Sequence, residues 1–436
     1  MAGPGIRSWE FARLLAREHA VTLAAPAPLP PREGSIQSVE ATFRSVRNQA
    51  AASDVVVMQA SALDLFPALE GCPAPLVLDW YDPYIIENLE IHRDQRLEDR
   101  MRMHDQDLAV LRRQATVGDF FLCATQRQRH LFIGVLTAMN RVNPVLYRAD
   151  PNLSNLIAIV PFGVPDEPLR PSGPALRGVV EGIGAADFVL LWGGGIWNWF
   201  DPLTLLEAVH RVAGDHPELK LVFMGTVHPN PSVPRQRMTL EAIKLAKRLG
   251  LEGRNVFFRE GWVPYDERQG FLAEATCGVS LHHQHVETEF AFRTRALDYL
   301  WAGLPMIVSG GDAMSELVER EGLGLVATPG DVGGVARASA RMIEDDDFRA
   351  GCAKSARGVA DAYRWSKVAE PLLEFCRAPA RSPDAARREA AANPGLGDRA
   401  PRQQVTVARK AWNSLRHDGV GPFARRSYRY LRKRLM

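Results

Sequence analysis

Residues 188–209 have the sequence FVLLWGGGIWNWFDPLTLLEAV, in which an apolar run ends in three glycines and leads into an amphipathic stretch. A buried strand followed by a glycine turn and a helix is the repeating unit of parallel sheets covered by helices. Gly193, Gly194 and Gly195 would let a bulky anion approach the backbone amides ahead of the helix. Asp201 stands just before a proline, which is typical of a helix N-cap, so its expected role is structural.

The same alternation of short apolar runs and longer amphipathic stretches extends in both directions from this segment. The predicted strands cover residues 21–25, 54–58, 76–79, 120–123, 156–160, 188–192, 219–224, 256–258, 278–281, 306–309 and 324–326. Residues 165–174 are rich in Pro and Gly, which we interpret as an inter-domain hinge. The pattern therefore predicts two doubly wound, Rossmann-like α/β domains, at residues 1–165 and 175–377, with a ligand cleft between them.

The beginning of the chain departs from this pattern, because a strand should precede the first glycine turn. Gly3 and Gly5 instead form a predicted turn at once, followed by a predicted helix over residues 6–17. Either the true N-terminus lies upstream of Met1, or another segment fills the place of the first strand. We favour the first interpretation.

The composition is that of a soluble globular protein large enough for two domains, with 436 residues, 46% apolar and 24% charged. No apolar run reaches the roughly 18 residues of a membrane-spanning helix, and the first residues do not resemble a signal peptide. The five cysteines are widely spaced and form no Cys-x-x-Cys pair. Reduced thiols in a cytoplasmic protein are the expectation.

The net charge of +2 conceals a basic tail. Residues 405–436 contain nine Lys and Arg and one Asp, a local charge of +8, which leaves −6 for the rest. Residues 378–404, rich in Ala, Pro and Arg, are predicted to be a poorly ordered linker to it. Helical spacing in the tail places aromatic residues beside a basic face, which favours an anionic membrane surface. Packing back on the acidic body is the alternative, and nucleic acid is not expected.

Residues 286–305, VETEFAFRTRALDYLWAGLP, place charged side chains at the start of a predicted helix that lies between two strands. The dipole and free amides of a helix start favour phosphate. Arg293 and Arg295 add two planar donors suited to a diphosphate. Glu289 and Asp298 can face the same cleft, although ordinary pairing of Arg295 with Asp298 along a solvated helix would also explain the pattern.

This second half resembles the donor domain of a GT-B glycosyltransferase of the family 4 / group 1 type. The resemblance rests on residues 261–264, on residues 289–305 and on residues 315–331, with weaker matches at 121–126 and 159–164. It implies the GT-B fold, a nucleotide-diphosphate sugar as donor, and no bound metal or other cofactor. The roles implied for matching residues are the ribose for Asp298, the base for the Val263 backbone, the donor sugar for Glu289, and the diphosphate for Gly193, Gly194, Gly195, Arg293 and Arg295.

Several positions depart from the family pattern. Gly195 and Phe200 stand where the family has an Arg and a Lys for the diphosphate, so Arg293 and Arg295 are the expected substitutes. Glu289 matches the first family carboxylate only if one extra residue is allowed, and Glu287 remains an alternative. Tyr81 replaces the usual cleft His, while the adjacent Asp82 is kept.

The departures bear on the mechanism. A retaining transfer, as the resemblance implies, needs no protein base if the leaving phosphate takes the proton of the acceptor. An inverting transfer would need a base, for which Asp82 or Asp79 is available. We expect retention, with Glu289 and Asp82 as the candidate catalytic carboxylates. The acceptor should enter over Gly3, Gly5, Tyr81 and Asp82.

Histidines cluster at residues 281–285, LHHQH, at the end of a predicted strand. His282 could donate a hydrogen bond to the donor sugar or phosphate, and a structural role is equally open. A metal shared with His285 is a weaker alternative, because no Cys or carboxylate completes a recognisable ligand set.

The sequence thus predicts a cytoplasmic glycosyltransferase, attached peripherally to the inner face of the plasma membrane, that acts on a glycan or lipid-linked acceptor in cell-surface polysaccharide or glycoconjugate synthesis. Two alternatives remain open. One is a nucleotide-sugar 2-epimerase of the same fold, and the other is a non-catalytic GT-B-like partner subunit.

Overall fold

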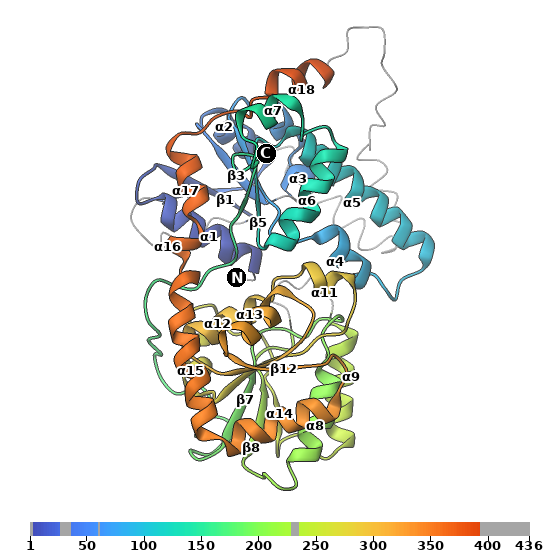
Figure 1. Ribbon diagram of the computed structural model, residues 1–436, viewed down its shortest axis with the longest axis vertical. Helices are drawn as coiled ribbons and strands as arrows, with labels where there is room; N and C mark the ends of the chain where they lie inside the picture. Colours follow the sequence, from blue (N-terminus) through green and yellow to red (C-terminus); the bar gives the residue numbers. More distant parts are fainter. Residues whose placement is uncertain (1–2, 27–35, 60–61, 228–234, 393–436) are drawn as a thin grey trace, which may run out of the picture. The chain divides into compact units, whose positions relative to one another are not determined.

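The computed structural model of the chain describes residues 3–26, 36–59, 62–227 and 235–392 (Figure 1). The chain divides into two compact units, Met1–Ala385 and Ala386–Met436, and the first unit holds all the strands. The predicted basic tail at 405–436 lies outside the described residues. Within the described part, no helix combines the length and apolar composition needed to cross a membrane.

The second half of the chain forms a six-stranded parallel sheet. Its strands are β7 (Phe188–Trp192), β8 (Leu219–Phe223), β9 (Val256–Phe258), β10 (Cys277–Ser280), β11 (Met306–Ser309) and β12 (Gly324–Ala327). Their order in the sheet is β12-β11-β10-β7-β8-β9, so the direction of winding reverses between β7 and β10. The carboxyl ends of strands beside such a reversal form the usual ligand crevice of an open α/β sheet.

Alternate residues of β7 enter two different cores, as expected for a strand with both faces covered. Leu190 and Trp192 pack with helices α8 (Pro202–Val212), α9 (Arg237–Arg248) and α14 (Val332–Glu344). Val189 and Leu191 pack with α12 (Thr294–Ala302), α13 (Ala313–Glu321) and α15 (Asp346–Ala360). The two helical layers on opposite sides of the sheet are visible in Figure 1. The prediction of a doubly wound second domain is confirmed.

The first half contains a four-stranded parallel sheet, ordered β3-β4-β5-β6. These strands are β3 (Val56–Gln59), β4 (Leu76–Asp79), β5 (Phe120–Cys123) and β6 (Ile157–Ile159). A separate parallel pair, β1 (Val21–Ala25) and β2 (Ile36–Glu40), completes the strands. The helices are α1 (Gly3–Leu15), α2 (Phe43–Ala51), α3 (Ala62–Leu65), α4 (Tyr84–Ile91), α5 (Leu97–Val117), α6 (Gln126–Ala138) and α7 (Pro144–Ala149), with the 3-10 helix η1 (Pro67–Gly71) between α3 and β4.

Each predicted strand is present, with ends that agree to within two residues, and residues 165–174 contain neither helix nor strand. Two expectations were wrong. Strand β2 was not predicted, because IQSVE lacks a continuous apolar run. The predicted glycine turn at Gly3 and Gly5 is instead the first turn of α1. A helix start tolerates proline and glycine there, because its first amides need no intrahelical partner.

The end of the described chain returns to the first half. Helix α16 (Trp365–Val368), which follows the 3-10 helix η2 (Asp361–Tyr363), and α17 (Glu370–Arg377) both contact α1. Residues 378–384 then run along β5, where Ser382 and Asp384 are buried, and the amide of Ser382 donates to Asp119 at 3.1 Å. Helix α18 (Ala385–Ala392) follows. The expectation of a poorly ordered linker is therefore wrong for residues 378–392, because buried polar contacts and a helix occupy them, whereas 393–404 lie outside the described residues.

Candidate active site

The glycine loop after β7 is held in place by Tyr299 of α12. The Tyr299 hydroxyl accepts a 2.8 Å hydrogen bond from the amide of Gly193 and lies 2.8 Å from the Leu191 carbonyl and 3.0 Å from the Val279 carbonyl. Gly194 has a φ of +79°, and a Cβ added there would meet nothing within 4 Å. The loop thus exposes backbone at the carboxyl end of β7, where an anion could approach it.

Arg295 lies beneath this loop. Its Nη2 donates to the Gly195 carbonyl at 2.9 Å, and its guanidinium lies 4.0 Å from the Phe200 ring centroid and 4.7 Å from that of Trp192. Burial lowers its pKa to about 10, so it stays charged at neutral pH. Its Nη1 is buried and has no hydrogen-bond partner among the described residues. Such a donor is available to an anionic ligand.

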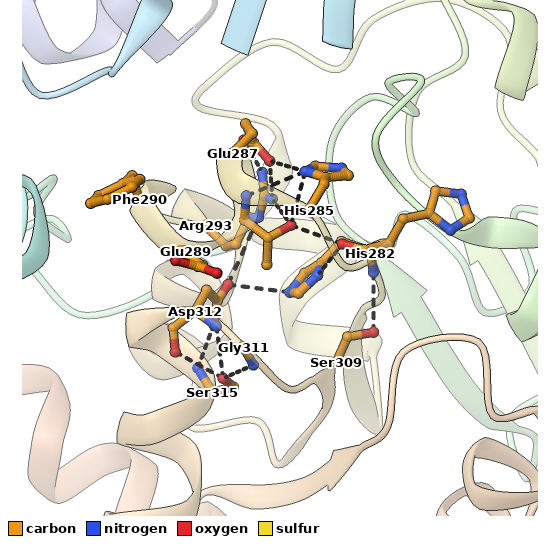
Figure 2. Close-up of polar contacts among 12 residues, drawn as sticks. His282, His285, Glu287, Glu289, Phe290, Arg293, Ser309, Gly311, Asp312 and Ser315 are labelled. Atoms are coloured by element: carbon orange, nitrogen blue, oxygen red, sulfur yellow. Dashed lines mark hydrogen bonds and ion pairs between the residues drawn. The ribbon is translucent and has the colours of Figure 1, made fainter. Parts of the chain in front are cut away.

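Arg293, the other predicted diphosphate ligand, forms an ion pair with Glu287. Its Nη1 and Nη2 donate to both carboxylate oxygens of Glu287, at 2.9 and 2.7 Å, and its Nε lies 3.8 Å from Asp312 (Figure 2). All three side chains are buried. Through this bidentate pair, Arg293 holds helix α11 (Val286–Phe290) in position. Its role as a diphosphate ligand stays a prediction, which the pairing with Glu287 does not favour.

His282 is completely buried, which does not favour its predicted contact with the donor. Its Nε2 lies 3.4 Å from Asp312, and its backbone amide donates to the Ser309 hydroxyl at 3.1 Å (Figure 2). Burial raises the Asp312 pKa, but the hydrogen bond and charge of His282 and the charge of Arg293 outweigh it and hold that pKa below its usual range. His285 caps α11. In the described part of the chain, no three His, Cys, Asp or Glu side chains are grouped to hold a metal ion.

Asp82 lies among half-buried acidic side chains. Its carboxyl group is hydrogen-bonded to Glu87 of α4. The charge of Glu287 raises the pKa of both groups, and the charge of Arg293 lowers it. Burial raises the pKa of both Asp82 and Glu87, and for Glu87 the neighbouring charge of Asp82 raises it further. One proton shared between the two carboxylates is the arrangement that burial favours. The raised pKa values of Glu87 and Asp82 favour a protonated carboxyl group at this pair.

Glu289 is the predicted carboxylate for the donor sugar, and its side chain is exposed. It lines a cavity of about 510 Å³ together with residues of α6 and with Phe290 and Gly311. Arg127 of α6 crosses the edge of this cavity, where it donates to the carbonyls of Gly311 at 2.7 Å and Glu289 at 3.2 Å and pairs with Glu316. Between Glu289 and Glu287, the two alternatives, only Glu289 faces open space.

Asp298 does not pair with Arg295. It accepts a 3.1 Å hydrogen bond from Arg268 Nε, and Arg268 lies over the ring of Tyr265 at 3.6 Å. The Asp298 side chain keeps 31% of its surface exposed, so one carboxylate oxygen can still receive a ligand. Val263 is buried in the loop before helix α10 (Arg268–Glu274). The ribose and base roles of Asp298 and Val263 stay predictions.

Gly3, Tyr81 and Asp82, which were predicted to lie on the acceptor side, are half-buried. Asp79, which the sequence offered as an alternative base, receives 2.6 and 3.0 Å hydrogen bonds from Arg7, a side chain with no exposed surface. Burial raises the pKa of Tyr81 well above its usual value. A Cβ added at Gly3 would lie 3.5 Å from the Tyr81 hydroxyl, whereas Gly5 is exposed. Asp79 therefore has a structural role.

Sequence reasoning missed three functional candidates, Glu87, Arg127 and Gln128. Each lies on a helix of the first half and contacts residues that are far away in sequence. The only signal that could have found Arg127 and Gln128 is their place in the first turn after β5, where strand ends and helix starts meet the cleft. No pattern in the sequence marks Glu87.

Comparison with known proteins agrees with this geometry. Residues 187–345 match the family model described as Glycosyl transferases group 1, and no curated protein sequence matches the chain. HepE from Anabaena, solved with UDP and glucose, has a TM-score of 0.63 at 16% identity over 87% of this chain and 97% of its own. WaaG, a glycosyltransferase involved in lipopolysaccharide biosynthesis, has 0.60 at 16% identity over 87% and 97%. Sucrose-phosphate synthase from Thermosynechococcus elongatus has 0.59 at 14% over 86% and 93%.

These likenesses extend over both halves of the chain, and the family match covers the half that carries the glycine loop, Arg295 and Asp298. The chain therefore has the GT-B fold seen in these glycosyltransferases, and its residues 187–345 match the family model of the group 1 glycosyltransferases.

Proposed function

We propose that this group 1 glycosyltransferase moves a sugar from a nucleotide diphosphate to a glycan or lipid-linked acceptor. The observation that carries the proposal is Arg295, a half-buried cation beneath the glycine loop whose buried Nη1 has no hydrogen-bond partner among the described residues. It supplies the positive charge that the substitutions at Gly195 and Phe200 would otherwise remove from a diphosphate site. HepE was solved with UDP-glucose, so uridine donors are the first to test.

We further propose that transfer proceeds with retention. The two bases that inversion could use are both engaged, because Arg7 neutralises Asp79 and Glu87 is hydrogen-bonded to Asp82. A retaining reaction needs neither, since the leaving diphosphate can take the proton of the acceptor hydroxyl. The product anomer, determined by proton NMR, tests this proposal, and an inverted product would reject it.

Two observations support a proposal for the acceptor and the location. WaaG, which is similar over 87% of the chain, acts in lipopolysaccharide biosynthesis. The +8 tail at 405–436 matches an anionic lipid surface in charge. We therefore propose a role in cell-surface polysaccharide or glycoconjugate synthesis, peripherally on the cytoplasmic face of the plasma membrane. Flotation of the full chain with phosphatidylglycerol vesicles tests the membrane contact.

A panel of UDP, GDP and dTDP sugars in thermal-shift assays identifies the donor. One nucleotide class should raise the unfolding temperature, because ligand that binds only the folded state stabilises it. Product analysis with the donor alone distinguishes a transferase from a 2-epimerase, which would convert the sugar without any acceptor. If no nucleotide diphosphate bound, the chain would be a partner subunit and the proposed function would be wrong.

The site itself is tested at Arg295. Arg295→Gln should weaken UDP binding by roughly tenfold or more in calorimetry, because a charge-assisted hydrogen bond to phosphate is lost. Arg337→Gln is the matched control, since Arg337 lies on α14 with 78% of its side chain exposed and should leave the affinity unchanged. Equal UDP affinities of Arg295→Gln and wild type would show that Arg295 does not bind the diphosphate.

A further inference from the structure

Gln128 connects two segments that carry the candidate catalytic carboxylates. Its side-chain Nε2 donates to the Tyr81 carbonyl at 2.9 Å and to the Phe290 carbonyl at 2.8 Å. Tyr81 immediately precedes Asp82, and Phe290 immediately follows Glu289. One amide nitrogen therefore joins the backbone beside Asp82 to the backbone beside Glu289.

The orientation of this amide is determined by its surroundings. Gln128 has no exposed surface, and its Oε1 accepts a 2.7 Å hydrogen bond from the amide of Ala124. Reversing the amide would place oxygen against two carbonyls and nitrogen against an N–H, so only one orientation satisfies all three bonds. The helix that carries Gln128 is itself fixed at its start, because the Thr125 hydroxyl accepts from the Gln128 amide at 3.1 Å. Gln128 is thus a rigid connection.

The segment on the other side of this connection is short and depends on outside contacts. Helix α11 has five residues, and it contacts both α4 and α6. Isolated helices of this length are not stable in water. Contacts that hold it include the Glu287–Arg293 pair, Arg127 on the Glu289 carbonyl, and Gln128 on the Phe290 carbonyl. Only Gln128 is bonded to the loop of Asp82 as well.

We propose that Gln128 is a positioning residue of the transfer reaction, which sets the separation between the Asp82 loop and the Glu289 segment while touching neither substrate. The proposal rests on the proposed function, in which the Glu289 segment lies at the donor and the Asp82 loop at the acceptor. Loss of the connection should therefore lower turnover without lowering nucleotide affinity, since Arg295 and the glycine loop do not contact Gln128.

Two substitutions at Gln128 distinguish loss of this connection from loss of the fold. Gln128→Glu keeps the shape and the acceptor for Ala124 but turns both donors into an oxygen that faces carbonyls. Gln128→Met removes the same donors without burying a charge, so it tests the proposal if Gln128→Glu fails to fold. Gln126→Glu is the matched control, because Gln126 is exposed on the same helix turn.

Hydrogen exchange measured by mass spectrometry on the ligand-free chain is the direct test. Amides of residues 286–291 should exchange roughly tenfold faster in Gln128→Met than in Gln126→Glu, because opening is easier once two bonds are lost, while peptides over α8 should be unchanged. UDP affinity should stay within about twofold of wild type, and kcat with the donor found in the panel should fall.

Unchanged exchange at 286–291 would overturn the proposal, and so would equal acceleration in every peptide, which would make Gln128 a residue of global stability alone. Neither result depends on a substrate. Failure of every nucleotide sugar to bind would reject the proposed function. The exchange experiment would still test whether Gln128 holds residues 286–291 in place.

Discussion

Two half-buried carboxyl groups with raised pKa values, Asp82 and Glu87, make the structure sensitive to pH at the level of single residues. Burial and the charge of Asp82 raise the Glu87 pKa well above its usual value. A raised pKa in the folded state adds stability below the ordinary pKa of a glutamate, and this stability is lost as pH rises through the folded-state value. The pair should therefore cost stability at alkaline pH, with Glu287 adding repulsion and Arg293 reducing it.

Glu87→Gln removes this titration. We expect the variant to unfold at a temperature a few degrees above wild type at pH 8 and at nearly the same temperature at pH 4, because glutamine is neutral at both. Differential scanning calorimetry between pH 4 and 8 measures the difference. Glu98→Gln, on an exposed residue of α5, is the control and should show no such trend. A constant offset between Glu87→Gln and wild type across pH would contradict the shared proton.

At the same scale, the sequence predicted which residue types form the site better than it predicted their partners. The glycines and Arg295 lie together after β7, as their positions at a strand end and a helix start implied. The partners of Arg293 and Asp298 were not predictable, because Glu287 and Arg268 reach them only after α10, α11 and α12 have packed. The sequence shows that a position carries a charged side chain, but the partner of that side chain is known only from the tertiary fold.

Among elements, the packing of α12 on β10 is close enough to require a glycine. A Cβ added at Gly278 would lie 2.3 Å from a ring carbon of Tyr299, well inside any real carbon contact. Gly278→Ala should therefore destabilise the chain by about 1–3 kcal/mol and displace the Tyr299 hydroxyl from the Gly193 amide. Urea unfolding and UDP calorimetry measure the two effects.

The matched control for Gly278→Ala is Gly351→Ala, on α15, where an added Cβ meets nothing within 4 Å. Alanine has the higher helix propensity, so this variant should be neutral or more stable than wild type. If Gly278→Ala were as stable as Gly351→Ala, Tyr299 would not be pressed against β10.

The elements themselves were largely predictable. Strands buried on both faces form continuous apolar runs, which is why β4, β5, β7 and β11 begin and end where the sequence places them. Strand β2 was missed because it belongs to a two-stranded sheet with polar residues along it. Its pairing with β1 is a long-range contact, which local pattern does not encode.

On the scale of the whole molecule, a buried ion pair links the end of the described chain to the first half. Arg141 Nε donates to Asp384 at 3.0 Å, and both side chains are almost completely buried. Asn143 donates to the same carboxylate at 3.0 Å. Asp384→Ala should lower the free energy of unfolding by about 3–5 kcal/mol, because it leaves a buried guanidinium without its counter-ion.

Urea unfolding followed by tryptophan fluorescence measures this loss. Glu374→Ala, an exposed residue of α17, is the control and should change the midpoint little. An unchanged midpoint in Asp384→Ala would show that residues 378–384 contribute no stability to the first half.

The position of Asp384 also sets an order of events during synthesis. Arg141 leaves the ribosome 243 residues before the carboxylate that neutralises it. Domains usually fold in the order in which they are translated, at about 5–20 residues per second. At those rates, roughly ten seconds or more pass between the synthesis of Arg141 and that of Asp384. A nascent chain that stalls before residue 384 would therefore expose an incomplete first half to chaperones and proteases.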